Sequence, residues 1–258
     1  MHYLIRYGEI GLKGLNRPFF ENKLISNIRA IINDKDARIT KKQGRLILEA
    51  GKDVSERLKH VFGIVSFSIA EKVDFDRLND FVIEKIKNKK FETFRVTVNR
   101  INKSFPKTSE DLAREIGAYV VEKLNKKVSL KEYDLNVRIE IIDSAYVFFD
   151  RTECYGGLPV GVEGKVIVLI QTKKGIEAAK RVMKRGCDII PLSFKRFDLA
   201  ELNEYLPIKK EIAIIKDTKE IDEIAKKENA KALVVEDSFE NLEDYDVKIA
   251  VLRPLAFD

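Results

Sequence analysis

The spacing of apolar residues changes several times along the chain, and each change marks the boundary of a predicted strand or helix. Over the first 70 residues the pattern predicts a strand, a helix, a hairpin, a short helix and a strand. These elements cover His2–Tyr7, Phe19–Ile32, Ala37–Ala50, Val54–His60 and Ile64–Ala70. Pro18 suits the first turn of the first helix, and Gln43-Gly44 suits the turn of the hairpin. We expect a small α+β unit with a ferredoxin-like fold.

A second α+β unit is predicted from the elements that follow. They are a helix, a strand, a loop, a helix and two strands, over Asp74–Lys89, Phe94–Asn99, Asn102–Thr108, Leu112–Leu124, Leu135–Ile142 and Ala145–Asp150. The strand shows a two-residue period and the loop breaks it with Pro106. Ser109, directly before the amphipathic helix, is the predicted N-cap.

The last part of the chain alternates between strands and helices in the manner of a parallel sheet. Tyr155–Gly161, with closely set Gly and Pro residues, is a predicted linker. After it come a buried strand at Val166–Ile170, a helix at Gly175–Arg185 and a strand at Cys187–Leu192, and the alternation continues to Val251. We therefore expect three domains, at 1–72 (ferredoxin-like), 73–160 and 161–258 (a small Rossmann-like parallel sheet), in an α/β and α+β fold class.

The net charge of the chain limits the kinds of molecule that it is expected to bind. The 258-residue chain has a formal net charge of +6, and residues 1–70 hold 13 Lys/Arg against 7 Asp/Glu, so the excess lies at the N-terminal end. A basic surface favours nucleic acid, whereas the acidic stretch Glu236–Asp246 would repel it. The longest apolar runs are far below the roughly 20 residues that span a bilayer, and no signal peptide is evident. We expect a cytoplasmic protein without a membrane partner.

The loop after the strand at Phe94 is the main candidate for binding. Arg95, Arg100, Lys103 and Lys107 place four cations within thirteen residues without an acidic one, and Phe105 adds a ring. Basic side chains bind phosphates, and an exposed ring can stack on an unpaired base. The alternative is that Phe105 belongs to the core and the cations form a solvated surface.

Two stretches of the sequence resemble a known family. The pattern FxVxxxRxxKxFPxxS…G, formed here by Phe94, Val96, Arg100, Lys103, Phe105, Pro106, Ser109 and Gly117, resembles the THUMP domain of the tRNA 4-thiouridine synthetases, the ThiI family. LIRYGEIGLKGLNRPFFENKL resembles the opening of the same proteins. The resemblance implies binding to the tRNA acceptor stem and 3′ end, with Lys13 and Arg17 as further RNA contacts. It also makes a homodimer an expectation.

The family's ATP loop, SGGxDS, is replaced in this chain. After Val166–Ile170 the turn is Gln171-Thr172-Lys173-Lys174-Gly175, which lacks the paired glycines, the Asp and the Ser. Side chains at 172–174 would crowd the phosphates that glycines let the backbone reach. Ala232–Ser238 resembles the family segment ALVTGES, and the chain ends at Asp258, before further catalytic residues of the family. We expect a degenerate PP-loop domain with no catalytic or ATP-binding residues.

Metal and thiol chemistry have little support in the sequence. Two cysteines and two histidines, far apart, indicate neither a disulfide framework nor a zinc site, and we assign no metal ligands. Cys187 follows Gly186 inside a predicted strand and is expected to be a core thiol. Cys154, near the linker, is expected to be more exposed, and a persulfide role for it is the less favoured reading.

The prediction is therefore a tRNA-binding protein that recognises the acceptor end without ATP-dependent chemistry or a cofactor. Its expected role is either to deliver tRNA to a separate modifying enzyme or to stabilise a complex. The first alternative is an active tRNA sulfurtransferase, using ATP and Mg²⁺, with a divergent ATP site or completed by a partner subunit. The second alternative is a scaffold protein that does not bind RNA, which the balanced charge of residues 71–258 keeps open.

Overall fold

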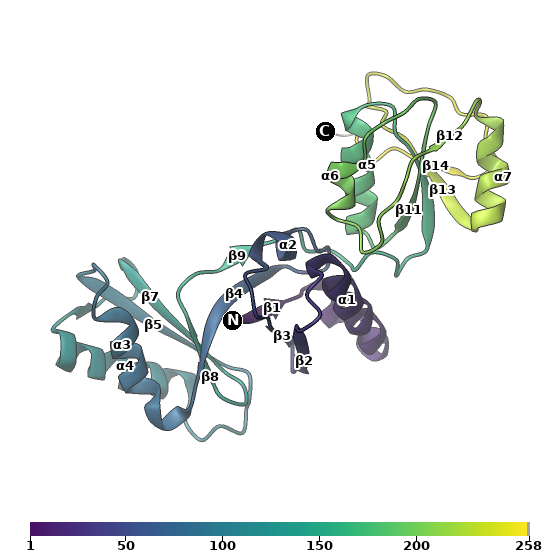
Figure 1. Cartoon of the computed structure of the whole chain (residues 1–258). Helices are drawn as coiled ribbons and strands as arrows, with labels where there is room; N and C mark the ends of the chain where they lie inside the picture. Colours follow the sequence, from purple (N-terminus) through teal and green to yellow (C-terminus); the bar gives the residue numbers. More distant parts are fainter. Residues whose placement is uncertain (257–258) are drawn as a thin grey trace. The chain divides into compact units, whose positions relative to one another are not determined.

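A computed structural model describes residues 1–256, and Asp258 lies outside the described part (Figure 1). Its contacts divide the chain into two compact units that interleave in sequence. The first comprises Met1–Arg6, Asp36–Asp53 and Ser66–Thr152, and the second comprises Tyr7–Lys35, Val54–Val65 and Glu153–Asp258. The predicted domain boundaries at residues 72 and 160 divide the chain into consecutive segments, whereas each of these two units is made of several separate segments. The predicted boundaries therefore stay predictions.

The first six elements have the order of a ferredoxin-like fold, βαββαβ. They are β1 (His2–Arg6), α1 (Arg17–Ile32), β2 (Arg38–Lys42), β3 (Arg45–Glu49), α2 (Ser55–Lys59) and β4 (Ser66–Val73). The strands lie in the order β2-β3-β1-β4 and pair antiparallel throughout. The hairpin turn was predicted correctly, because Gly44 has the φ of +68° that a tight turn needs.

Strand β4 joins two halves of one nine-stranded sheet. Ser66–Ala70 pairs with β1, and Glu71–Val73 pairs with β8. The second half continues in the order β8-β7-β5-β6. Its strands are β5 (Thr93–Arg100), β6 (Lys127–Val128), β7 (Leu135–Ile141) and β8 (Ala145–Phe148). The ninth strand, β9 (Thr152–Glu153), lies outside this order and pairs with β4.

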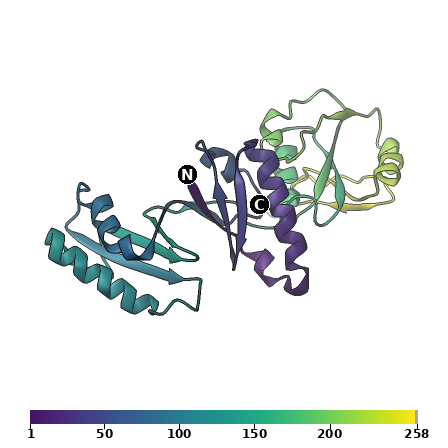
Figure 2. The same ribbon diagram turned by 60° about the horizontal axis from the view of Figure 1, so that its bottom comes forward.

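Helices α3 (Leu78–Ile86) and α4 (Ser109–Leu124) pack on one face of this second half. Figures 1 and 2 show them together on one side of β5 and β7. The core between them includes Val82, Phe94, Ile116, Val137 and Ile139. Since side chains alternate along a strand, the polar residues of β5 and β7 point to the opposite face.

Several element boundaries differ from the sequence-based prediction. Thr108, not Ser109, is the N-cap of α4: its backbone is extended and its Oγ1 accepts a hydrogen bond from the backbone N–H of Asp111 at 3.1 Å. The helix predicted from Asp74 begins as a 3-10 turn, Phe75–Arg77, and becomes α-helical at Leu78. The two-residue strand β6 was not predicted, because it is too short to show a period.

The second unit contains a five-stranded parallel sheet, as predicted from the alternating pattern. Its strands are β10 (Lys165–Leu169), β11 (Asp188–Ser193), β12 (Ala213–Ile214), β13 (Ala230–Val234) and β14 (Ala250–Leu252), and its helices are α5 (Lys173–Lys184), α6 (Ala200–Asn203) and α7 (Lys219–Glu228). The order β12-β11-β10-β13-β14 reverses direction between β10 and β13. In open parallel sheets this switch point is where ligands bind, outside the carboxyl ends of the strands.

Two segments of the second unit connect its longer elements. The glycine-rich stretch at 8–14 forms two short 3-10 turns, Glu9–Leu12 and Gly14–Asn16, which lead into α1. The predicted linker at 155–161 has neither helix nor strand. No helix among residues 1–256 is long and apolar enough to cross a membrane.

Candidate nucleic-acid interface

The basic loop between β5 and α4 is held in shape by one of its own arginines. Arg100, the last residue of β5, donates hydrogen bonds from Nη1 to the carbonyl oxygens of Phe105 at 2.8 Å and Lys107 at 3.0 Å. At the other side of the loop, Asn102 accepts a hydrogen bond from the backbone N–H of Ser104 at 3.0 Å. Arg100 therefore holds the loop in shape by binding two backbone carbonyl oxygens of the loop, and it also contributes a positive charge.

Phe105 anchors the middle of the same loop. Its half-buried ring lies 4.6 Å from the ring of Phe75 and packs against the core under α3 and α4. This position agrees better with the prediction that Phe105 belongs to the core than with the prediction that its ring stacks on a base. The predicted base contact stays a prediction, since it requires the exposed part of the ring.

The three remaining loop cations have different surroundings. Lys103 is exposed and makes no hydrogen bond or ion pair within residues 1–256. Lys107 forms an ion pair with Glu115 of α4. Arg95 donates to the carbonyl oxygen of Leu130 at 3.3 Å and lies 5.9 Å from the centre of the Tyr133 ring. Lys103 is thus the cation of this group most available to a phosphate.

Lys13 and Arg17 lie in the second unit, whereas the other five predicted RNA contacts lie in the first. Lys13 is half-buried, with its Nζ 4.7 Å from the centre of the Phe20 ring and 4.0 Å from Glu163. Arg17 forms an ion pair with Glu21 at 2.7 Å. It also donates to the Tyr7 hydroxyl at 2.7 Å, and these two hydrogen bonds raise the pKa of Arg17.

At the switch point of the parallel sheet, a carboxylate of the chain itself occupies the loop after β10. Glu236, just past β13, accepts hydrogen bonds through Oε2 from the backbone N–H groups of Gln171 at 3.3 Å and Thr172 at 3.1 Å. Gly175 allows this approach, because a Cβ there would lie 2.6 Å from the same oxygen. The family segment ALVTGES has glycine where this chain has Glu236.

Sequence reasoning missed the role of Glu236. We treated it as the start of an acidic stretch, although its place at the end of a buried strand was the available signal. The neighbouring Asp237 is buried and holds the following turn, through Tyr245 at 2.8 Å and Arg253 at 3.1 Å. Lys173 and Lys174 lie at the N-terminus of α5 and are exposed.

Both thiols are half-buried. Burial, with the charge of Glu153, raises the pKa of Cys154 to about 12. Burial also raises the pKa of Cys187, with Glu163 as the next cause. Because the thiolate is the reactive form, these environments suit structural thiols better than sulfur carriers. The greater exposure expected for Cys154 is not seen, since it lies in the same burial class as Cys187.

Comparison with protein families identifies two domains in the first 150 residues of the chain. Residues 2–68 match the ThiI ferredoxin-like domain, and residues 72–150 match the THUMP domain. A probable tRNA sulfurtransferase from Thermoanaerobacter pseudethanolicus is 41% identical over 201 residues, which are 74% of this chain and 52% of the relative. Another from Thermococcus kodakarensis is 37% identical over 207 residues, 73% of this chain and 54% of the relative. The chain thus spans about half the length of these curated relatives.

Solved structures share the whole fold. PH1313 from Pyrococcus horikoshii superposes with a TM-score of 0.88 at 27% identity and covers 100% of this chain and 95% of its own. A 4-thiouridine synthetase solved with RNA and ATP has a TM-score of 0.79 at 24% identity, over 100% of this chain and 81% of that one, and shows the fold alone. The chain therefore belongs to the family of the tRNA sulfurtransferases, of which it carries the ThiI ferredoxin-like domain and the THUMP domain.

Proposed function

We propose that this protein binds tRNA at the acceptor stem and 3′ end and has no ATP-dependent chemistry of its own. The THUMP domain and the relatives named as tRNA sulfurtransferases support the choice of ligand. The basic loop supports the place of contact. Arg100 and Phe105 fix the loop, and Lys103 extends from it toward solvent, where a phosphate would meet a positioned cation.

The single observation that carries the second half of the proposal is the position of Glu236. In a PP-loop domain the free backbone N–H groups after the first strand bind the phosphates of ATP. In this chain the N–H groups of Gln171 and Thr172 already donate to a carboxylate, which also repels phosphate. The residues present at this site do not fit ATP and Mg²⁺, so the proposed function includes no ATP-dependent step.

The chemistry of RNA binding needs no cofactor, and we infer none. In this proposal the protein acts in the cytoplasm and presents tRNA to a separate modifying enzyme, and the domain at 161–258 serves as a scaffold or docking face. A homodimer remains an expectation from the family, which sedimentation of the purified chain would test.

RNA binding is tested by titrating a full-length tRNA transcript, and the same transcript without its 3′ single-stranded end, at several salt concentrations. Contact with four to six phosphates predicts a slope of log K against log[salt] of roughly −3 to −5, with weaker binding after the 3′ end is removed. Lys103→Ala should weaken binding, whereas Lys123→Ala, on the last turn of α4, is the matched control. Equal, weak binding of both RNAs would favour the scaffold alternative.

The ATP half of the proposal has a separate test. We expect no ATP binding by the wild-type chain in calorimetry and no pyrophosphate release with tRNA present. Glu236→Ala frees the two N–H groups and removes the negative charge, so it should bind phosphate compounds more tightly than wild type. Pyrophosphate release by the wild-type protein would contradict the proposal.

That outcome would support the alternative, an active tRNA sulfurtransferase with a divergent site or one completed by a partner subunit. The observation that favours it is the name shared by the curated relatives, of which this chain spans about half. Formation of 4-thiouridine in a tRNA transcript, after addition of ATP, Mg²⁺ and a sulfur donor, would establish it.

A further inference from the structure

One face of the sheet formed by β5 and β7 is left open by the helices of its own unit. Helices α3 and α4 both pack on the other face, over a core that includes Phe94 (Figures 1 and 2). Since side chains alternate along a strand, Arg95 and Thr97 of β5 point away from this core. The parallel register places Arg95 beside Asn136 and Thr97 beside Arg138 of β7. These four side chains form a polar surface, which we call the open face.

The short loop before β7 is fixed to the start of β5 at both of its ends. At one end, the backbone N–H of Ser129 donates to the carbonyl oxygen of Phe94 at 2.9 Å. At the other end, the carboxylate of Asp134 accepts from the backbone N–H groups of Glu92 and Thr93 at 3.0 and 2.9 Å, and from the Thr93 hydroxyl at 3.0 Å. The hydrogen bonds from Thr93 and Glu92 lower the pKa of Asp134. The loop therefore has a fixed position on the sheet.

This loop places an aromatic ring and an apolar side chain beside an arginine of the open face. Leu130 is 68% exposed, and Tyr133 is 36% exposed. The Arg95 guanidinium donates to the carbonyl oxygen of Leu130 at 3.3 Å and lies 5.9 Å from the centre of the Tyr133 ring. The loop thus positions Arg95 next to the ring. Aromatic rings and guanidinium planes are the groups on which RNA-binding proteins stack unpaired bases.

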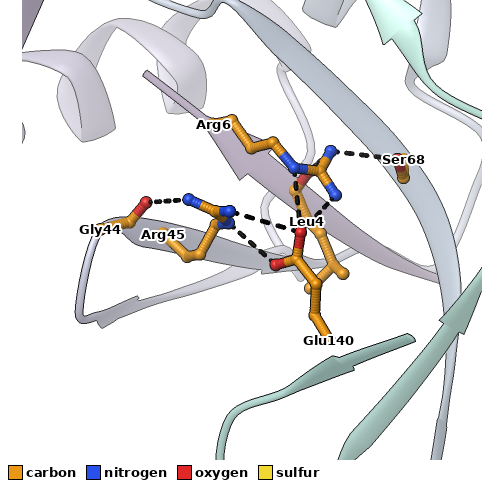
Figure 3. Close-up of polar contacts among 6 residues, drawn as sticks. All are labelled: Leu4, Arg6, Gly44, Arg45, Ser68 and Glu140. Atoms are coloured by element: carbon orange, nitrogen blue, oxygen red, sulfur yellow. Dashed lines mark hydrogen bonds and ion pairs between the residues drawn. The ribbon is translucent and has the colours of Figure 1, made fainter. Parts of the chain in front are cut away.

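The charges around the open face favour an anionic ligand. Residues 126–138 contain four Lys or Arg residues against two acidic residues. Glu140, further along β7, is buried, and its two oxygens accept from Arg6 and Arg45 (Figure 3). The guanidinium of Arg138 is half-buried and makes no hydrogen bond or ion pair with residues 1–256. A nucleic-acid strand on this face would therefore meet an excess of positive charge.

The open face and the basic loop lie along the same strand. Arg95 is near the start of β5, and Arg100, which holds the basic loop in shape, is its last residue. Five residues of a strand span about 16 Å at 3.3 Å per residue, a length that about five stacked nucleotides cover at 3.4 Å each. A short single strand of RNA in contact with the basic loop is therefore long enough to reach the Tyr133 ring.

We infer that Tyr133 and Arg95 form a stacking site for an unpaired base at the 3′ end of the tRNA, with Leu130 beside the base. An aromatic ring stacks on any base, and the neighbouring cation strengthens the contact. Tyr133 is more exposed than the half-buried Phe105. The inference rests on the proposed function and extends it, because it assigns contact with a base to a residue outside the basic loop.

The test compares tRNA binding by the full chain and by its Tyr133→Ala variant, with the intact transcript and with the transcript that lacks its 3′ single-stranded end. Loss of one stacked base should weaken binding of the intact transcript about five- to hundred-fold. The salt slope should not change, because stacking releases no counter-ions. Binding of the shortened transcript should stay the same.

Two further variants are the controls. Tyr133→Phe keeps the ring and should bind the intact transcript like wild type. Tyr119→Ala removes a half-buried tyrosine from α4, on the opposite side of the same sheet, and should also bind like wild type. It matches the loss of a tyrosine side chain without touching the open face.

A second measurement does not depend on the folding of a variant. It uses a series of transcripts, each with one abasic nucleotide in the 3′ single strand, so that every phosphate is kept and one base is lost. At one position, the abasic nucleotide should weaken wild-type binding by the same factor as Tyr133→Ala, and it should not weaken binding by Tyr133→Ala any further. Additive effects at every position would show that no base stacks on Tyr133 and would overturn the inference.

The outcomes separate this inference from the proposed function. If wild-type binding is salt-dependent and sensitive to Lys103→Ala, but Tyr133→Ala binds like the Tyr119→Ala control, the inference fails and the proposed function stands. An equal loss of affinity for the intact and the shortened transcripts would mean that Tyr133 only supports the fold, which also overturns the inference. If the wild-type chain does not bind tRNA, both fail.

Discussion

Glu140 is the residue on which the polar side of the nine-stranded sheet depends. Its carboxylate is almost completely buried and joins Arg6 of β1 and Arg45 of β3 to β7. A buried carboxylate is costly unless it is paired and hydrogen-bonded, and here both oxygens accept from guanidinium groups. The two arginines in turn depend on Glu140, because Arg6 is only 8% exposed.

Glu140→Ala should therefore lower the free energy of unfolding by roughly 3–5 kcal/mol, because it leaves a buried guanidinium without its counter-ion. Urea denaturation followed by circular dichroism measures this value. Lys42→Ala removes a more exposed ion pair, at 3.0 Å from Asp143, and should cost less than about 1 kcal/mol. Equal effects of the two substitutions would mean that the burial of Glu140 does not determine how much its ion pairs contribute to the free energy of unfolding.

At the level of elements, the basic loop ends where α4 begins, and Thr108 caps the N-terminus of this helix. Thr108 accepts from the backbone N–H of Asp111, and it donates from Oγ1 to the carboxylate of the same residue at 2.7 Å. The cap satisfies one of the free N–H groups of the first turn and fixes where the loop ends. Ser109, one residue later, is already helical.

Thr108→Ala should cost about 1 kcal/mol of stability through loss of the cap, whereas Ser109→Ala should change stability by less than about 0.5 kcal/mol. Chemical denaturation of both variants compares the two positions directly. The reverse order of effects would show that the sequence-based assignment of the cap to Ser109 was right.

For the molecule as a whole, thiol and phenol groups whose pKa is raised in the folded protein make stability depend on alkaline pH, and the half-buried Cys154 and Tyr7 are two of them. The pKa of Cys154 rises from an ordinary 9.0 to about 12, chiefly through burial. The pKa of Tyr7 rises from 10.0 to about 12, through burial and its hydrogen bond to Glu21. Since both groups lose their proton more easily in the unfolded chain, their contribution to stability is complete below pH 9 and decreases as the pH rises toward 12.

We therefore expect the Tm to be nearly constant between pH 7 and 8.5 and to fall steadily above pH 9. Scanning fluorimetry across this range measures the fall. Cys154→Ala removes one of these groups and should make the fall shallower, although the substitution itself lowers the Tm at neutral pH. A Tm that stays constant up to pH 11 would show that these groups ionise as readily in the folded protein.

Local patterns in the sequence were enough to predict most of the elements and the family. Periodic apolar residues were enough to predict the ferredoxin-like order, the hairpin at Gly44 and the parallel sheet, because burial of one face is a local property of the pattern. The stretches around Gly8–Gly14 and Phe94–Gly117 were enough for the family, which the domain matches confirm. The basic loop was also evident, since its cations are neighbours in the chain.

Contacts between charged residues that are far apart in the sequence depend on how the strands pair. Arg6, Arg45 and Glu140 are separated by up to 134 residues, and no local pattern relates them until the register of β1, β3 and β7 is known. In the same way, Glu236 meets Gln171 and Thr172 because β10 and β13 are neighbours at the switch point of the sheet. The sequence determines on which face of a strand a charged side chain lies, and the pairing of the strands determines which residue it contacts.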